Sequence, residues 1–189
     1  MQDNTVLHIK NMVCDRCVMV VEDVLKNQHI EFNKITLGNV TLQKQLTNEE
    51  KEKLSTKLES LGFELLQSKK NVLVEKIKNL IIQQIQYSTE QIPVNLSTYL
   101  SSQLHADYSS LSNTFSQEEN ITIEQFTILQ KTEKIKELLS YGEKTLTEIA
   151  DQMGYASVAY LSTQFKKQTG LSPSQYKSSS ALRKPLDKV

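Results

Sequence analysis

Apolar residues near the C-terminus recur at the spacing of a helix. Leu146, Ile149 and Met153 are three or four positions apart, so they fall on one face of a predicted helix. Gly154 follows at once, and glycine readily takes the left-handed conformation that closes a helix. Ser157, a favourable N-cap, marks the start of a second helix. The pattern therefore predicts two short helices separated by a tight turn.

The second of these helices has its own apolar stripe. Leu161 and Phe165 are one turn apart, and Gly170 and Pro173 end the segment. Two short helices across a turn are typical of the helix-turn-helix arrangement, in which the second helix enters the major groove of DNA.

A weaker copy of this pattern lies fifty residues earlier. The matching positions pair Leu96 with Leu146, Ala106 with Ala156, Leu111 with Leu161, Phe115 with Phe165, and Asp107 with the capping Ser157. The copy keeps the packing residues and changes the exposed ones. Such a repeat predicts two similar lobes that read different bases.

Two further helices are predicted around this repeat. Val74, Ile77, Ile81 and Ile85 form an apolar stripe that is typical of core packing, and residues 121–139 form a long helix joining the two lobes. No glycine- or proline-rich linker precedes the first stripe, so the domain boundary is placed between residues 70 and 71.

The first seventy residues alternate between strand and helix patterns. Strands are predicted at residues 6–9, 30–37, 40–42 and 63–66. The expected inner faces of the two helices are Cys17, Val20, Val21, Val24 and Leu25, and then Leu54, Leu58 and Leu61 after a capping box at Thr47–Glu50. The predicted fold class is therefore α+β: a ferredoxin-like βαββαβ domain at residues 1–70, then an all-α domain with two helix-turn-helix lobes at 71–189.

Charge is balanced, which is unusual for a protein that binds DNA. The chain has 22 basic and 22 acidic side chains, and each predicted domain is also neutral. A positive surplus is confined to the C-terminus, where Asp187 is opposed by Lys166, Lys167, Lys177, Arg183, Lys184 and Lys188. Phosphate contact and solubility both explain such a tail.

Several classes of protein are disfavoured by what the sequence lacks. No apolar run is long enough to span a membrane, and the N-terminus does not resemble a signal peptide. We therefore expect a cytoplasmic protein with reduced cysteines. No spacing of serine, histidine and acid suggests a hydrolase and no glycine-rich phosphate loop occurs, so an enzyme is not expected.

Candidate chemistry lies at Cys14 and Cys17, between the first predicted strand and helix. Two thiols three positions apart at a helix N-terminus can face one ion, and the helix dipole and Arg16 favour thiolates. Thiolate pairs select Cu(I), Zn²⁺ and similar metals. A redox pair, and a domain that keeps the fold without a ligand, remain alternatives. His29 is the first candidate for a third ligand, although such histidines are more often ordinary surface residues.

These motifs resemble two known families. Residues 72–177 resemble the double helix-turn-helix DNA-binding domain of AraC-type transcription regulators, most closely in the second lobe. Residues 4–69 resemble the heavy-metal-associated domain of copper chaperones, through Met12, Cys14, Cys17 and Gly62–Phe63. Asn11 replaces the family's usual glycine, and Val13 stands where zinc-preferring members have aspartate. The resemblance therefore implies Cu(I) in preference to zinc.

The first resemblance also implies which residues face DNA. Base-reading positions are Tyr108, Ser109, Ser112 and Asn113 in the first lobe, and Val158, Ala159, Ser162 and Thr163 in the second. Lys166 and Lys167 would meet phosphates, whereas Glu118 and Glu119 stand where the family has basic residues and would repel them. The family usually has arginine at the position of Lys131.

The sequence thus predicts a transcription regulator that binds double-stranded DNA and responds to a metal ion at Cys14 and Cys17. One alternative is a DNA-binding regulator whose N-terminal domain is only an interaction module. Another is a metallochaperone whose helical domain docks a protein. The oligomeric state and the direction of regulation are left open by the sequence.

Overall fold

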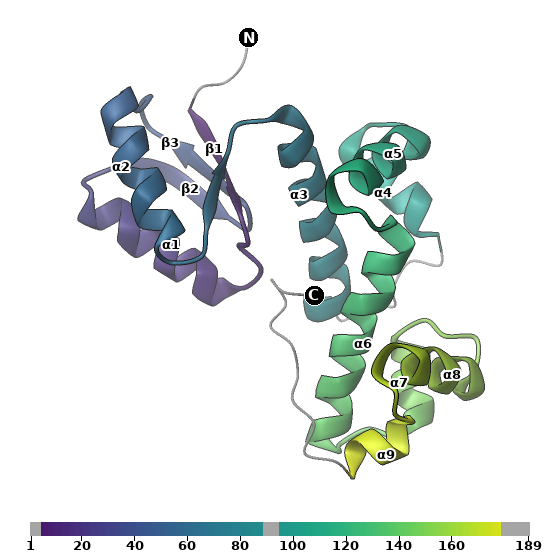
Figure 1. Ribbon diagram of the computed structural model, residues 1–189. Coiled ribbons are helices and arrows are strands. Elements are labelled where there is room, and N and C mark those ends of the chain that lie inside the picture. Colours follow the sequence, from purple (N-terminus) through teal and green to yellow (C-terminus); the bar gives the residue numbers. More distant parts are fainter. Residues whose placement is uncertain (1–4, 89–94, 179–189) are drawn as a thin grey trace. The chain divides into compact units, whose positions relative to one another are not determined.

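The computed structural model describes residues 5–88 and 95–178 (Figure 1). Two compact units are present, Met1–Asn79 and Leu80–Val189. They divide inside one helix, downstream of the boundary placed between residues 70 and 71. The predicted basic residues Arg183, Lys184 and Lys188 lie outside the described residues.

The N-terminal unit contains a small antiparallel sheet and two helices that follow its first and third strands. Its elements are β1 (Val6–Lys10), α1 (Asp15–Asn27), β2 (Phe32–Thr36), β3 (Asn39–Leu42), α2 (Asn48–Glu59) and β4 (Glu64–Leu66). The strand order is β2-β3-β1-β4. Thr47 and Glu50 form the predicted capping box, which fixes the start of α2.

The core of this unit lies between the sheet and helices α1 and α2. Leu7 and Ile9 of β1 alternate with partly exposed neighbours, and they pack in one cluster with Val21 of α1 and Leu54 of α2. Two predicted inner-face residues do not belong to this core. Val20 is 38% exposed and Leu61 is 43% exposed, because the buried stripes are narrower than the apolar patterns suggested.

Helix α3 (Lys69–Ile82) leaves the sheet and crosses the division between the two units. The predicted stripe is confirmed, since Val74, Ile77, Ile81 and Ile85 are all buried. The helix continues as a π-helical turn, η1 (Gln83–Tyr87), in which Ser88 N–H donates to the Gln83 carbonyl.

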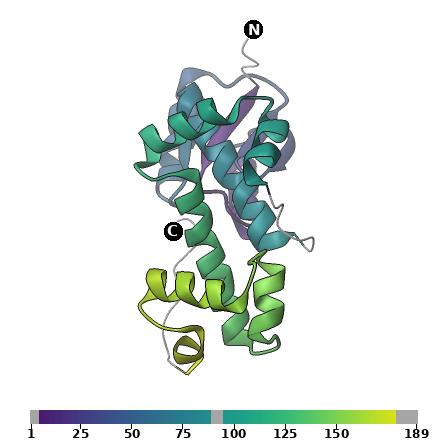
Figure 2. The same ribbon diagram turned by 90° about the vertical axis from the view of Figure 1, so that its right-hand side faces the viewer.

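The C-terminal unit is helical. It contains α4 (Leu96–Leu104), α5 (Tyr108–Glu119), α6 (Ile123–Tyr141), α7 (Leu146–Gln152), α8 (Val158–Thr169) and α9 (Pro173–Lys177). In both ribbon views α6 runs from the α4–α5 lobe to the α7–α8 lobe (Figures 1 and 2). We call residues 95–120 the first lobe and residues 145–170 the second lobe.

Two predicted boundaries in this unit were wrong. Helix α6 begins at Ile123 because the Thr122 side chain accepts from Gln125 N–H and caps it there. Pro173 does not simply end α8; it is the first residue of α9, where a proline N–H would be unused anyway.

Candidate nucleic-acid interface and thiol pair

The two cysteines lie together at the N-terminus of α1. Their Sγ atoms are 3.4 Å apart, and Cys17 N–H donates to the Cys14 carbonyl at 2.9 Å. Both thiols are free and partly exposed. Burial raises the pKa of the Cys17 thiol. Hydrogen bonds from the backbone act in the opposite direction and lower it, but by less. At Cys17 burial thus opposes the stabilisation of the thiolate that is expected from the helix N-terminus, and Arg16 is exposed to water.

The loop before Cys14 is held by hydrogen bonds from a residue with left-handed backbone. Asn11 has φ of 70°, a conformation that asparagine tolerates better than most non-glycine residues. Its N–H donates to Glu75 Oε1 of α3 at 3.0 Å, and its Nδ2 donates to the Gly62 carbonyl at 2.9 Å. Met12 is fully buried in the core. Asparagine thus fits where the resembling family has glycine.

His29 is not a third ligand for the thiol pair. It follows the C-terminus of α1, whereas the cysteines are at the N-terminus, and 13 helical residues span about 20 Å. Among residues 5–88 and 95–178, no group of three or more histidine, cysteine or acidic side chains could hold a metal ion. Any metal at this pair would therefore have no third histidine, cysteine or acidic ligand from the described residues.

Helix α8 of the second lobe has a buried face and an exposed face. Ser157 Oγ accepts from Tyr160 N–H at 3.1 Å, which confirms the predicted cap. Leu161 and Phe165 are buried, so the residues between them point elsewhere. Gly170, at φ of 78°, closes the helix as predicted.

The predicted DNA-facing residues of α8 divide into exposed and half-buried positions. Ala159 and Thr163 are exposed, whereas Val158 and Ser162 are half-buried. Thr163 Oγ1 donates to the Ala159 carbonyl at 3.0 Å, which leaves the hydroxyl oxygen able to accept. Lys166 and Lys167 in the last turn of α8 are exposed. These exposed groups suit a nucleic-acid backbone and base edges.

Two of the four corresponding residues of the first lobe, Tyr108 and Ser109, form hydrogen bonds within the protein. The Tyr108 hydroxyl donates to Glu124 Oε1 of α6, and burial together with this carboxylate raises the pKa of Tyr108. Ser109 donates to Asp107, the N-cap of α5. Ser112 is half-buried and Asn113 is exposed. Ser109 and Asn113 are therefore the two exposed residues of the four, and the Ser109 hydroxyl is already bonded to Asp107.

The turn of the second lobe is fixed by Lys131 and Tyr155. Lys131 Nζ donates to the Met153 carbonyl, the C-cap of α7, at 2.7 Å and lies 5.1 Å from the centre of the Tyr155 ring. Burial lowers the pKa of Lys131. The Tyr155 hydroxyl donates to Gln164 at 2.5 Å, and burial raises the pKa of Tyr155 to about 12. These contacts join α6, the turn and α8.

Tyr160 is a surface residue of α8 that the sequence reasoning missed. Its side chain is 57% exposed, and its ring lies 5.9 Å from the ring of Tyr155. The available signal was a large aromatic residue outside the stripe of Leu161 and Phe165. An exposed aromatic ring beside the predicted reading positions can pack against sugar or base.

Comparison with known proteins agrees with this geometry. Residues 100–179 match a family model described as a helix-turn-helix domain. The C-terminal domain of AraT, a response regulator from Geobacillus stearothermophilus, is 30% identical over 61% of this chain and 91% of that domain, with a TM-score of 0.51. The chain belongs to the AraC-type helix-turn-helix family. Members of this family regulate transcription by binding DNA, so the helical unit is a DNA-binding unit.

Two other solved structures are similar to this AraC-type chain. The C-terminal domain of the two-component response regulator yesN from Fusobacterium nucleatum is 30% identical and covers 55% of this chain and 95% of that domain, with a TM-score of 0.46. A DNA-binding transcriptional dual regulator from Escherichia coli K-12 is 19% identical. The match covers 56% of this chain and 89% of that chain, with a TM-score of 0.46. No curated protein matches the chain. None of the helices in the described ranges has the length and apolar character to cross a membrane.

Charge separates the two lobes of this AraC-type unit. The first lobe contains no lysine or arginine, and its acidic residues are Asp107, Glu118 and Glu119. In the second lobe, Glu148 and Asp151 are balanced by Lys166 and Lys167. Phosphate attraction thus favours the second lobe.

Proposed function

We propose that this chain is a cytoplasmic, sequence-specific transcription regulator that binds double-stranded DNA mainly through α8 and responds to a thiophilic metal ion. The observation that supports it best is the exposed face of α8, where Ala159 and Thr163 are followed by Lys166 and Lys167. Methyl groups and a hydroxyl suit base edges, and the two lysines suit the backbone.

The N-terminal unit is, in this proposal, a ferredoxin-like heavy-metal-associated domain. Its antiparallel strand order, β2-β3-β1-β4, and its two helices support that assignment. Cys14 and Cys17 would hold the ion. Two soft sulfur donors suit Cu(I), whereas a structural Zn²⁺ site needs four ligands. Their Sγ separation of 3.4 Å fits a shared ion after small side-chain rotations.

A direct contact supports a route from the thiol pair toward the helical unit. Asn11, three residues before Cys14, donates its backbone N–H to the buried Glu75 of α3. Helix α3 continues into η1, where Gln86 Nε2 donates to the Gln130 carbonyl of α6 at 3.2 Å and Lys134 Nζ donates to the Gln86 carbonyl at 3.1 Å. A change at the loop would therefore bias a continuous helix that ends against α6.

The test is anaerobic metal competition on the full chain, followed by DNA retention with and without Cu(I). We expect one Cu(I) per chain, tighter than zinc, and a metal-dependent change in DNA affinity that disappears in the Cys14→Ser, Cys17→Ser double variant. A Ser55→Ala variant on the exposed face of α2 is the matched control and should behave as wild type.

The other outcomes separate the alternatives. DNA binding without any metal effect would mean that the N-terminal unit is an interaction module. Metal binding without retention of any DNA in low salt would favour a metallochaperone whose helical unit docks a protein. Equal or tighter zinc binding would contradict the copper preference.

A further inference from the structure

We propose that an open cavity in the N-terminal unit binds a small organic anion with two or more negative charges and an apolar portion. The cavity has a volume of about 1040 Å³ and is lined by residues of β1, β4, α2, α3 and the segment before α2. It includes neither cysteine. This inference goes beyond the proposed function and depends on neither DNA nor metal binding.

Cationic side chains surround the cavity without a carboxylate among its lining residues. Lys51 comes from α2, and Lys69 and Lys76 come from α3. None of these three lysines forms an ion pair with another residue of the described ranges, 5–88 and 95–178. Three uncompensated ammonium groups around one concavity produce a positive potential that an anion would neutralise.

Nearby carboxylates are already engaged elsewhere. Glu49 pairs with Lys53 at 2.7 Å, and Glu50 accepts from Thr47 in the capping box. Neither glutamate lines the cavity. The three cavity lysines are therefore available to an incoming anion.

The helix dipoles add to this potential. Asn48 and Lys69 are the first residues of α2 and α3, so both helices begin at the cavity. The first turn of α3 has Lys69 and Lys70 and no acidic residue, although the positive end of a helix dipole disfavours cations. A bound anion would relieve that unfavourable arrangement.

His8 supplies a further polar group at the wall of the cavity. Its Nδ1 donates to Asn39 Oδ1 at 2.7 Å, which orients the ring and leaves Nε2 for a ligand. Burial lowers the pKa of His8, and the positive charge of Lys76 lowers it further. The hydrogen bond with Asn39 acts in the opposite direction and raises it. An anion beside His8 would offset both lowering effects.

The remaining wall determines the chemical class of the ligand. Val6, Leu66, Val72 and Leu73 line the cavity and are only partly buried. Because these apolar side chains remain partly exposed to solvent, they favour a ligand with an apolar portion over a bare inorganic ion. Carboxylate and phosphate groups share the required charge, and different probes distinguish them.

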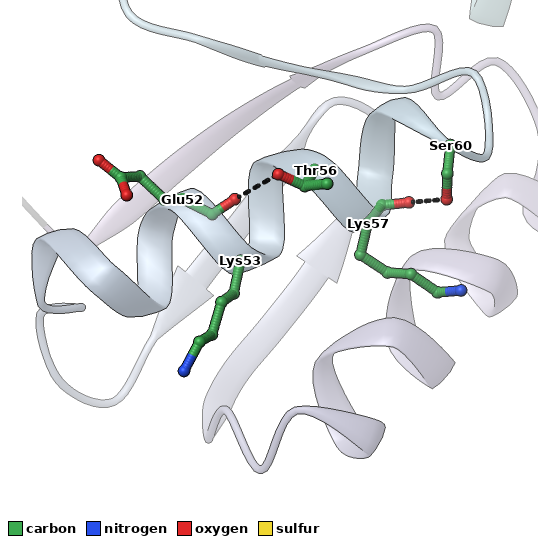
Figure 3. A pocket seen from close by; sticks show the side chains of 5 residues that line it. All are labelled: Glu52, Lys53, Thr56, Lys57 and Ser60. Atoms are coloured by element: carbon green, nitrogen blue, oxygen red, sulfur yellow. Dashed lines mark hydrogen bonds between the residues drawn. The ribbon is translucent and has the colours of Figure 1, made fainter.

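A second concavity, on the exposed face of α2, lacks these features. Figure 3 shows Thr56 and Ser60 bonded to the carbonyls of Glu52 and Lys57, so their hydroxyl protons are already used within the helix. Glu52 also places a carboxylate there. Lys57 is therefore suitable as a control position.

The experiment is calorimetric titration of the full, metal-free chain with phenyl phosphate and with phthalate, using phenol as the neutral analogue. We expect at least one dianion to bind, phenol not to bind, and the Lys51→Gln, Lys76→Gln double variant to lose at least tenfold in affinity. The control variant Lys34→Gln, Lys57→Gln removes the same charge from exposed sites outside the cavity and should lose less than twofold.

Three results would overturn the proposal: no binding of either dianion, equal losses in the two variants, or binding of phenol as tight as that of the dianions. If the double variant does not fold, Lys76→Gln alone is titrated while the imidazole resonances of His8 are followed by NMR. Unmoved His8 resonances in wild type on saturation would likewise exclude this site. The assay contains no DNA and no metal, so its failure leaves the proposed function untouched.

Discussion

The first and second lobes repeat one structural plan at a constant offset of fifty residues. The N-caps Asn95 and Thr145 begin the first helix of each lobe, and Asp107 and Ser157 begin the second helix. Each second helix ends in a left-handed C-cap, Asn120 in one lobe and Gly170 in the other. The offset therefore applies to helix ends as well as to apolar positions.

The same offset continues into the helix that follows each lobe. Phe115 packs against Phe126 of α6, with ring centres 5.7 Å apart, and Phe165 packs against Tyr176 of α9 at 5.5 Å. Aromatic pairs of this kind add stability beyond the area they bury. Each repeat thus includes the start of a third helix that packs on the second helix of its lobe.

The exposed surfaces follow no such rule. Lys166 and Lys167 of α8 correspond to Ser116 and Gln117 of α5, and the neutral cap Ser157 corresponds to the anionic Asp107. Burial restricts a side chain to shapes that fill the core, whereas an exposed position is restricted only by what it binds. The difference teaches that one scaffold supports an acidic lobe and a neutral lobe whose second helix ends in two exposed lysines.

The largest effect is expected from an acidic substitution at matched exposed positions of α5 and α8. Thr163→Asp should weaken operator binding about 100-fold, because a carboxylate would face base edges and phosphates. Asn113→Asp, fifty residues earlier, should cost less than about threefold. Gel retardation on the operator measures both. Equal losses would break the comparison by making the lobes equivalent.

Removing the lysines of α8 should have the next largest effect. Lys166→Ala with Lys167→Ala should weaken binding to all sequences about tenfold and reduce the salt slope by roughly one to two, since phosphate contacts release counterions. A salt series on specific and random duplexes provides the measurement. Lys57→Ala in the N-terminal unit serves as the control. An altered sequence preference would show that these lysines read bases.

Reversing the charge of the two glutamates at the C-terminal end of α5 should strengthen DNA binding. Glu118→Lys with Glu119→Lys should raise affinity several-fold and steepen the salt dependence by roughly one for each new phosphate contact. Glu143→Lys, exposed after α6, is the matched charge control. Unchanged affinity and salt slope would place Glu118 and Glu119 away from DNA. The difference between the lobes would then depend on the N-terminal half of α5 alone.

The smallest effect concerns the tyrosine bonds of the two lobes. The Tyr108 hydrogen bond is the main cause of the lowered pKa of Glu124. A lowered folded-state pKa stabilises the protein above the unfolded value near 4.3, and this contribution is lost as pH falls through the folded value. Tyr108→Phe should therefore remove less than about 1 kcal/mol at pH 7 and little at pH 3, as urea unfolding would measure.

Tyr155→Phe is the matched change in the second lobe. Its partner Gln164 is neutral, so the loss of stability should not vary between pH 7 and pH 3. The same pH dependence in both variants would contradict the assignment of the effect to Glu124.

The features that sequence could predict are those with a local cause. The caps at Thr47, Asp107 and Ser157 are set by side chains that bond to backbone two or three residues away. The buried stripe from Val74 to Ile85 follows from helical spacing. In the lobe repeat, the pairs Leu111 with Leu161 and Phe115 with Phe165 are buried as predicted, whereas Ala156 is exposed.

The features that sequence could not predict depend on contacts between distant residues. Glu75 accepts a hydrogen bond from Asn11, which is 64 positions away in the sequence. No motif near either residue predicts that bond. Tyr108 meets Glu124 only because α5 packs on α6. The exposed Val20 and Leu61 show that an apolar residue at helical spacing still needs a partner surface to be buried.

The π turn η1 changes which face of the helix is buried at the C-terminal end of α3. Adjacent residues are buried in pairs here, Ile81 with Ile82 and Ile85 with Gln86, as the wider turn moves the buried face by one position. Removing one residue ahead of Ile85 would turn Ile85 and Gln86 by about 100° around the helix axis and so away from their buried positions. A chimaera that joins another N-terminal domain to this helical unit should therefore keep Gln83–Tyr87 intact, with its junction before Lys69.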